Sequence, residues 1–211
     1  MPSKPSTRKQ LLLFDLDGVI VDSKANMALA WQAVQAELGV ALPFERYFSE
    51  IGRPFQDIMV RLGLSDQGRR IEAVYRRASS HHLDDTPLFP GIEAFFERLD
   101  GAGVKLGIVT SKDASRTQLV LDRLSVGFTV VMTPNNTLRG KPSPDPLLFA
   151  VATSNVDPAQ TVFVGDMDSD AEAARRAGID YVHVAWGYGA PPHADTVVAQ
   201  DTDDLFRLLL S

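Results

Sequence analysis

The chain has 211 residues, 45% of them hydrophobic, and a formal net charge of -6, which is typical of a soluble globular protein with one sizeable core. Its basic residues never run longer than a pair, so neither a nucleic acid nor an anionic membrane surface is expected as a partner. The absence of cysteine excludes disulfides and thiolate chemistry, and we expect a cytoplasmic protein.

The first predicted element is a buried strand over residues 11–15, which follows a polar lead-in of about nine residues. The apolar run of this strand is too short for a signal sequence or a membrane span. Residues 24–39, 54–63 and 66–83 then show three amphipathic helical patterns with no strand between them. The sequence therefore predicts a helical subdomain inserted after the first strand.

Strand-like and helical segments alternate over the rest of the chain. Four apolar runs rich in branched residues cover residues 104–111, 129–133, 161–166 and 181–186, and helical patterns lie between most of them. This alternation predicts an α/β fold, a Rossmann-like parallel sheet flanked by helices. We place the core at residues 10–22 and 87–211, and the helical cap at residues 23–86.

Polar residues follow three of these strands at the point where each strand ends. Asp15 ends the first, Thr110 and Ser111 end the second, and Asp166 ends the strand "TVFVGD". Ligands of open α/β sheets bind beyond the carboxyl ends of the strands, so residues far apart in sequence can meet there. We therefore expect these side chains to converge on one site.

Further charged residues accompany these strand ends. Lys141 precedes a predicted helix, and Asp168 and Asp170 follow Asp166 in "GDMDSD". Clustered carboxylates with one lysine, and with no histidine or cysteine among them, favour Mg²⁺ over zinc. A cation would also offset the repulsion between Asp15 and Asp17. Asp168 is expected to be only a charge at a helix N-terminus.

This residue set suits phosphoryl transfer. An ionised Asp15 in line with phosphorus can attack to form an aspartyl-phosphate, while Asp17 protonates the leaving oxygen and later activates water. The hydroxyl of Thr110, the backbone N–H groups near Asp17 and Gly18, and Lys141 are expected to bind the phosphoryl oxygens, with Ser111 beside Thr110.

The segments "DLDGV", "VTS", "KPSPD" and "GDMDSD" resemble the four motifs of the haloacid dehalogenase superfamily, in their order and context. The chain is similar to the phosphatase branch of that family with a small helical cap. The resemblance implies that Asp15 is the nucleophile, Asp17 the acid and base, Thr110 the hydroxyl of the second motif and Lys141 the lysine of the third. It places magnesium ligands at Asp15, Asp17 and Asp166, and makes Asp170 either a further ligand or a group that supports the ligands from outside.

The cap and the substrate are less defined by these patterns. Arg53 lies beside Gly52 in a predicted turn between cap helices, where its guanidinium could grip an anionic substrate. The resemblance implies a small phosphorylated metabolite, and both phosphoglycolate and sugar phosphates remain open. The sequence does not indicate the oligomeric state.

Two rival functions are considered. A phosphosugar mutase of the β-phosphoglucomutase type shares "FDLDGVI" and the cap, but Met27 stands where those mutases carry a cap histidine. A non-catalytic phosphate-binding or regulatory protein would also use clustered acids and a lysine. Such a protein would have no use for an acid and base at Asp17, so a phosphatase is favoured.

Overall fold

The computed structural model describes residues 9–135 and 138–210, so all but the last residue of the lead-in predicted over residues 1–9 lies outside the described residues. A sheet of six parallel strands has the order β3-β2-β1-β4-β5-β6. The strands are β1 (Leu11–Phe14), β2 (Lys105–Val109), β3 (Val130–Met132), β4 (Thr161–Gly165), β5 (Asp180–Val184) and β6 (Val198–Ala199). The predicted α/β class with a parallel sheet is confirmed.

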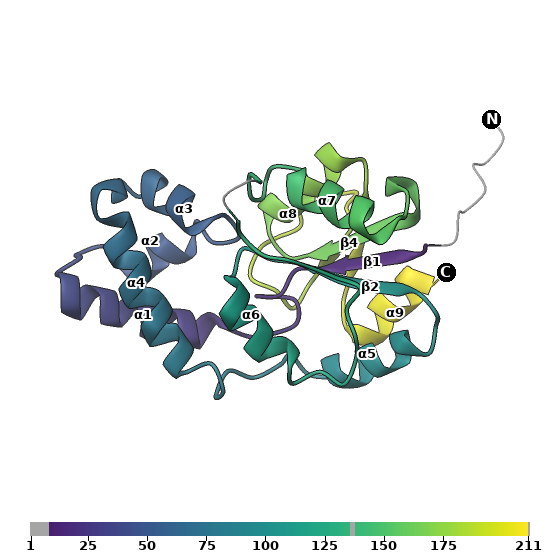
Figure 1. The fold of residues 1–211 in the computed structure, drawn as a ribbon, viewed down its shortest axis with the longest axis horizontal. Coiled ribbons are helices and arrows are strands. Elements are labelled where there is room, and N and C mark those ends of the chain that lie inside the picture. Colours follow the sequence, from purple (N-terminus) through teal and green to yellow (C-terminus); the bar gives the residue numbers. More distant parts are fainter. Residues whose placement is uncertain (1–8, 136–137, 211) are drawn as a thin grey trace.

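Helices cover both faces of this sheet (Figure 1). One face packs against α5 (Ile92–Asp100), α6 (Ala114–Leu121) and α9 (Thr202–Leu210), and the other against α7 (Asp145–Ser154) and α8 (Asp168–Ala177). The four residues of β1 are fully buried because they alternate between these two hydrophobic clusters. Strand β1 is therefore the centre of the core.

Four further α-helices form a unit at one end of the molecule (Figure 1). We call α1 (Lys24–Leu38), α2 (Phe44–Phe48), α3 (Phe55–Arg61) and α4 (Gly68–His81) the cap helices; a short 3-10 turn, η1 (Ser65–Gln67), precedes α4. They enclose a hydrophobic cluster of their own, in which the rings of Trp31 and Tyr47 stack with centroids 4.4 Å apart. The separate hydrophobic cluster agrees with our division of the chain into a core and a cap, which remains a prediction.

The two segments that join the cap helices to the core run beside each other. The N–H of Asp22 donates to the carbonyl of Pro87 at 2.9 Å, and the N–H of Phe89 donates to Ile20 at 3.0 Å. Asn26 of α1 and Thr86 add a side-chain hydrogen bond of 3.1 Å. The cap helices are thus joined to the core by two chain segments that are hydrogen-bonded to each other.

The strand order also fixes where a ligand can bind. Strands β2 and β4 lie on opposite sides of β1, which makes the carboxyl end of β1 the topological switch point of the sheet. Our sequence analysis does not predict β6, α2, α9 or the 3-10 turn η2 (Pro158–Gln160) before β4. Strand β6 has two residues and α2 has five, too few for a hydrophobic period to show.

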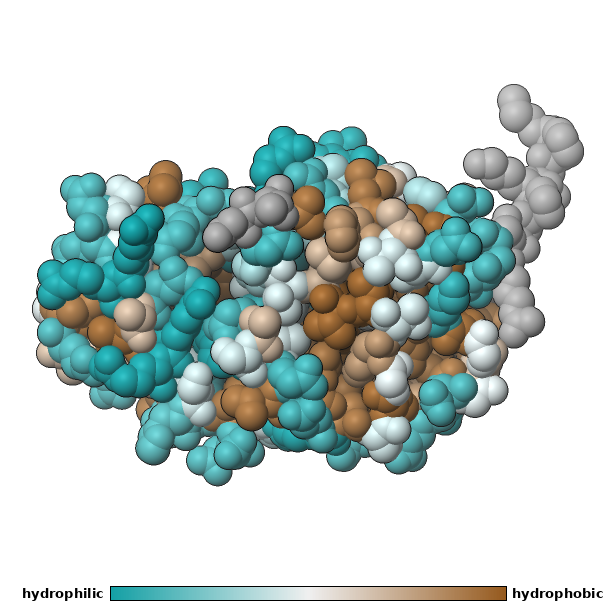
Figure 2. Space-filling view, in the orientation of Figure 1, coloured by the Kyte–Doolittle hydropathy of each residue, from teal (hydrophilic) through white to brown (hydrophobic). Residues whose placement is uncertain are grey.

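Figure 2 shows mainly hydrophilic residues over the cap helices and a gathering of hydrophobic residues on the core between α7 and α5. Near the sheet edge, Val131, Leu148 and Phe149 are 40% to 50% exposed. Among the described residues, no helix is both long enough and apolar enough to cross a membrane.

Candidate active site

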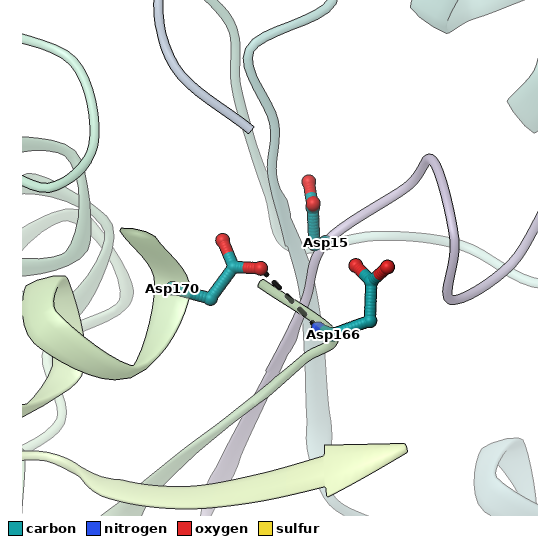
Figure 3. A group of neighbouring side chains, drawn as sticks. All are labelled: Asp15, Asp166 and Asp170. Carbon is teal, nitrogen blue, oxygen red and sulfur yellow. Dashed lines mark hydrogen bonds between the residues drawn. The ribbon is translucent and has the colours of Figure 1, made fainter. Parts of the chain in front are cut away.

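The carboxyl ends of β1 and β4 bring three carboxylates together. Asp15 follows β1, Asp166 follows β4, and Asp170 lies in the first turn of α8; one oxygen of each lies within 4.8 Å of the others. Figure 3 shows the three side chains pointing toward one another. The N–H of Asp15 donates to Val164 at 2.9 Å, so the pairing of the two strands holds Asp15 beside Asp166.

Lys141 is the cation of this cluster. Its Nζ lies 2.9 Å from Asp15 and 2.6 Å from Asp170, and its side chain is 1% exposed. Burial alone would lower the pKa of Lys141, but the charges of Asp15 and Asp170 and their hydrogen bonds raise it above its usual value. Lys141 therefore stays protonated and holds the two carboxylates in place.

Burial raises the pKa of Asp15 to about 7, because the charge of Lys141 only partly offsets the loss of solvation and the repulsion from Asp170. Burial, with the charges of Asp170 and Asp15, raises the pKa of Asp166 well above its usual value. Three ionised carboxylates would carry more negative charge than one lysine balances, which is why the pKa values of Asp15 and Asp166 are raised. A bound cation would relieve this repulsion.

The residues present fit a hard divalent cation. The three acids are buried and offer only oxygen ligands, the donor set that suits Mg²⁺. Within the described part of the chain, the buried Oδ1 of Asp166 has no hydrogen-bond partner, while its Oδ2 accepts the N–H of Tyr188 at 2.8 Å. One oxygen of Asp166 is therefore held in place and the other is free to bind a metal.

Asp170 has a second use in this geometry. Its Oδ2 accepts the backbone N–H of Met167 at 3.0 Å and that of Asp166 at 3.3 Å. These bonds fix the turn between β4 and α8 and leave the other oxygen to Lys141. Asp168, one residue into the same turn, is exposed and does not belong to the cluster, as expected of a charge at a helix N-terminus.

Asp17 lies at the site but outside the acid cluster. Its carboxylate is 2.9 Å from the Nζ of Lys112, whose side chain is 4% exposed. Our sequence analysis does not include Lys112, although it is the third consecutive polar residue after β2. The predicted role of Asp17 as a metal ligand stays a prediction, and the structure gives its carboxylate a different partner.

The predicted phosphate-binding residues differ in how they are placed. The Oγ1 of Thr110 accepts the N–H of Lys112 at 3.1 Å, which leaves its hydroxyl hydrogen free to donate toward the cavity that it lines. The hydroxyl of Ser111 instead donates to the carbonyl of Gly52 in the cap, at 3.1 Å. Ser111 thus joins the core to the cap helices in this structure.

Gly18 contributes to the site through packing. Its N–H donates to Val21 at 3.1 Å within a tight turn, and its predicted role in phosphate binding stays a prediction. Its φ of +85° suits glycine, and an added Cβ would lie 2.6 Å from the Cγ of Asp166. Gly187 packs against the other side of Asp166, a contact that sequence reasoning did not find.

A cavity of about 70 Å³ lies between this cluster and the cap helices. Asp15, Asp17 and Thr110 line it from the core, and Tyr47, Tyr75 and Arg53 line it from the cap. Arg53 follows Gly52, whose carbonyl also accepts the hydroxyl of Ser169 at 3.0 Å. Among the residues that the structure describes, Arg53 has no ion pair, so its charge is available to a ligand.

Clustered acids and a buried lysine at the ends of parallel strands, beside a cavity, place a candidate active site where open α/β sheets bind their ligands. The model of haloacid dehalogenase-like hydrolases matches residues 12–184. The chain therefore belongs to that family, in its phosphatase branch.

Three comparisons illustrate the likeness. A phosphoglycolate phosphatase of Cupriavidus necator is 36% identical over 190 residues, covering 85% of this chain and 82% of the relative. An N-acetylmuramic acid 6-phosphate phosphatase of Pseudomonas aeruginosa is 27% identical over 192 residues, covering 87% and 85%. The crystal structure of a hydrolase from Pseudomonas syringae has 25% identity and a TM-score of 0.82, covering 95% of this chain and 97% of that one.

Proposed function

We propose that this protein is a Mg²⁺-dependent phosphomonoesterase that hydrolyses a small phosphorylated metabolite through an aspartyl-phosphate at Asp15. The observation that carries the proposal is the meeting of Asp15, Asp166, Asp170 and Lys141 at one end of a covered cavity. The named relatives, one a phosphoglycolate phosphatase and one a sugar-phosphate phosphatase, support phosphoglycolate or a sugar phosphate as the substrate.

Asp15, Asp166 and Asp170 would hold the magnesium ion, which when bound supplies positive charge to phosphoryl oxygens. Lys141 fixes the orientation of Asp15 and stays protonated. The free hydroxyl hydrogen of Thr110 donates to a phosphoryl oxygen. These residues bind and orient the phosphoryl group before the reaction.

The reaction then has two displacements at phosphorus. A carboxylate oxygen of Asp15 bonds to phosphorus as the bond to the leaving oxygen breaks, and Asp17 gives that oxygen its proton. In the second step Asp17 takes a proton from water, the water oxygen bonds to phosphorus, and the bond to Asp15 breaks. The products are the alcohol and inorganic phosphate, and both acids return to their starting states.

Lys112 is suited to position Asp17 for both proton transfers. Their ion pair of 2.9 Å is nearly excluded from solvent, so it restricts the carboxylate to the cavity side of β1. Arg53, with its free charge on the cavity wall, is proposed to contact an anionic substrate. We also propose the cytoplasm as the location of this reaction, which a chain without cysteine suits.

A phosphatase fits the cavity better than a phosphosugar mutase does. No histidine lines the described cavity wall, and Met27 lies there instead. A regulatory protein is disfavoured because Asp17 and its lysine face the cavity beside Asp15. Met27 and the Asp17–Lys112 pair lie next to the phosphoryl site, and it is there that a phosphatase would differ from a mutase or a regulatory protein.

The test is a panel of phosphomonoesters with the full chain, stripped of metal by a chelator and then supplied with Mg²⁺. We expect phosphate release from at least one ester only when Mg²⁺ is present. Asp166→Asn should abolish that release, whereas the matched control Asp168→Asn, in the same turn but exposed, should keep near wild-type rates. No hydrolysis across the panel, or equal rates for the two variants, would refute the proposal.

A further inference from the structure

The cap side of the cavity contains a group of hydrogen-bond donors that the reaction at phosphorus does not use. Arg116 of α6 and the tyrosines Tyr47 and Tyr75 of the cap helices all line this cavity. Each of the three residues is at most 6% exposed. They come from both sides of the interface between the core and the cap helices, so their placement depends on the cap lying closed.

Arg116 is held in place by two of its three guanidinium nitrogens. Its Nε donates to Asp113 at 2.6 Å, and its Nη1 donates to the hydroxyl of Ser79 in α4 at 2.9 Å. The guanidinium carbon lies 5.7 Å from the ring centre of Tyr75. Within the residues that the structure describes, Nη2 makes no hydrogen bond, so two N–H groups of a fixed guanidinium remain able to donate.

The two tyrosines supply one more donor. Their ring centres are 5.3 Å apart, and their hydroxyl groups lie close enough to influence each other's pKa. Burial raises the pKa of Tyr75 to about 12 and raises the pKa of Tyr47 well above its usual value, so both stay protonated. A hydrogen bond between them would use only one of the two hydroxyl hydrogens, and the other is left for a partner.

The charges on the cavity wall favour a ligand rich in oxygen. Arg53, Arg76, Lys112 and Arg116 line the cavity against the carboxylates of Asp15 and Asp17. Lys112 is paired with Asp17, Arg116 with Asp113, and Arg76 with Glu72 as well as, at 3.6 Å, with Asp113. Among the described residues, the charge of Arg53 therefore remains unpaired on this wall. A hydrophobic leaving group would leave these donors unpaired, at a cost to binding.

We infer that Nη2 of Arg116, with the free hydroxyl of the Tyr47–Tyr75 pair, binds an oxygen acceptor on the leaving group of the substrate. Arg116 is then a specificity-determining residue, and the acceptor is either a carboxylate or a sugar hydroxyl. The inference rests on the proposed function, because it concerns the leaving group of the same phosphomonoester. The competing view is that Arg116 only ties the cap to the core through Ser79.

The experiment compares kcat/KM for 2-phosphoglycolate, glucose 6-phosphate and ethyl phosphate, whose leaving group carries no further oxygen. For the wild type we expect a clear preference for one of the first two, and the preferred ester identifies carboxylate or hydroxyl as the acceptor. Arg116→Met should lower kcat/KM for that ester about 10- to 100-fold, the worth of a hydrogen bond to a charged group, and that for ethyl phosphate less than about threefold.

Two further variants separate specificity from the attachment of the cap. Ser79→Ala removes the bond to Nη1 but keeps the bond from Nε of Arg116 to Asp113 and the donors of Nη2, so it should change kcat/KM for all three substrates by a common factor. Arg116→Lys keeps the charge but loses the planar donor set, and should recover only part of the preference. Thermal unfolding of each variant shows whether it is folded.

The outcomes distinguish a failure of the proposed function from a failure of this inference alone. If the wild type hydrolyses none of the three esters, the proposed function fails and this inference fails with it. If the wild type shows equal kcat/KM for all three, or Arg116→Met lowers all three by one factor as Ser79→Ala does, the inference alone is overturned.

Discussion

Replacing Gly18 with alanine tests whether the site depends on close packing around Asp166. At a φ of +85° a Cβ costs about 1–2 kcal/mol, because side chains clash with the backbone in this region. The new Cβ would also lie 2.6 Å from the Cγ of Asp166, and overpacking of this kind costs about 1–3 kcal/mol more. The expected loss in free energy of unfolding is therefore about 2–5 kcal/mol.

Gly178 offers a matched control at the end of α8. Its φ is +67°, and an added Cβ would meet nothing within 4 Å, so Gly178→Ala carries only the backbone cost of about 1–2 kcal/mol. Urea unfolding measures both losses, and an unchanged m-value shows that the same unfolding is compared. For a chain of this size the extra 1–3 kcal/mol corresponds to a Tm lower by about 2–12 °C.

The two variants should also differ in their response to metal. Stabilisation by a ligand grows with the ratio of its concentration to its Kd, so a displaced Asp166 weakens the effect of Mg²⁺ on Tm. We expect Gly178→Ala to keep the wild-type increase in Tm with Mg²⁺, and Gly18→Ala to lose most of it. Equal destabilisation by the two substitutions, with equal responses to Mg²⁺, would refute the packing argument.

Three further predictions concern charges around the cavity. Because the pKa of Asp15 is raised to about 7, its contribution to stability is present below pH 4 and is lost as the pH rises through 7. Metal-free protein should therefore have a lower Tm at pH 8 than at pH 5, and Mg²⁺ should restore the Tm at pH 8. A Tm that depends on neither pH nor Mg²⁺ would contradict this prediction. Lys112→Met should lower kcat by about 10²–10⁴-fold through misplacement of Asp17, with KM nearly unchanged; a wild-type kcat would remove Lys112 from the mechanism. Asp113 caps α6, so Asp113→Ala should lose about 1 kcal/mol more free energy of unfolding than Asp113→Asn, which keeps the capping oxygen. Although burial alone would raise the pKa of Asp113, the charge of Arg116 lowers it to about 2. In acid unfolding curves, the greater stability of the wild type over Asp113→Asn should therefore disappear as the pH falls from 4 to 2.

The strands and the acids at their ends could be predicted because each depends on a local pattern. The run "LLLF" is buried on both faces, and its length identifies a central strand without reference to the rest of the chain. The rule that ligands bind at strand ends then places Asp15 beside Asp166, across 151 residues, since the sheet is parallel. Asp170 and Lys141 join them as the motifs imply.

What the sequence did not reveal depends on contacts between distant segments. Lys112 gains its meaning only from Asp17, which lies 95 residues earlier, and a lysine before a helix has no periodicity that marks it. Ser111 has the residue type of a phosphate ligand, yet the cap turn at Gly52 takes its hydrogen bond. The position of Arg116 in the α6 sequence does not indicate a role, because its contacts with Ser79 and Tyr75 depend on where α4 packs. The placement of the cap helices decides the contacts of Ser111 and Arg116, whereas the pairing of β1 with β2 brings Lys112 to Asp17.

The central claim is that Asp15 carries the phosphoryl group. Asp17→Asn slows both proton transfers and, with a substrate whose leaving group needs little protonation, such as p-nitrophenyl phosphate, leaves the attack of Asp15 in place while it delays hydrolysis of the intermediate. Acid quenching of this variant during turnover with Mg²⁺, followed by peptide mass spectrometry, should show a phosphoryl adduct on the peptide that contains Asp15. An adduct at another residue, or turnover with no adduct at any time, would contradict the account.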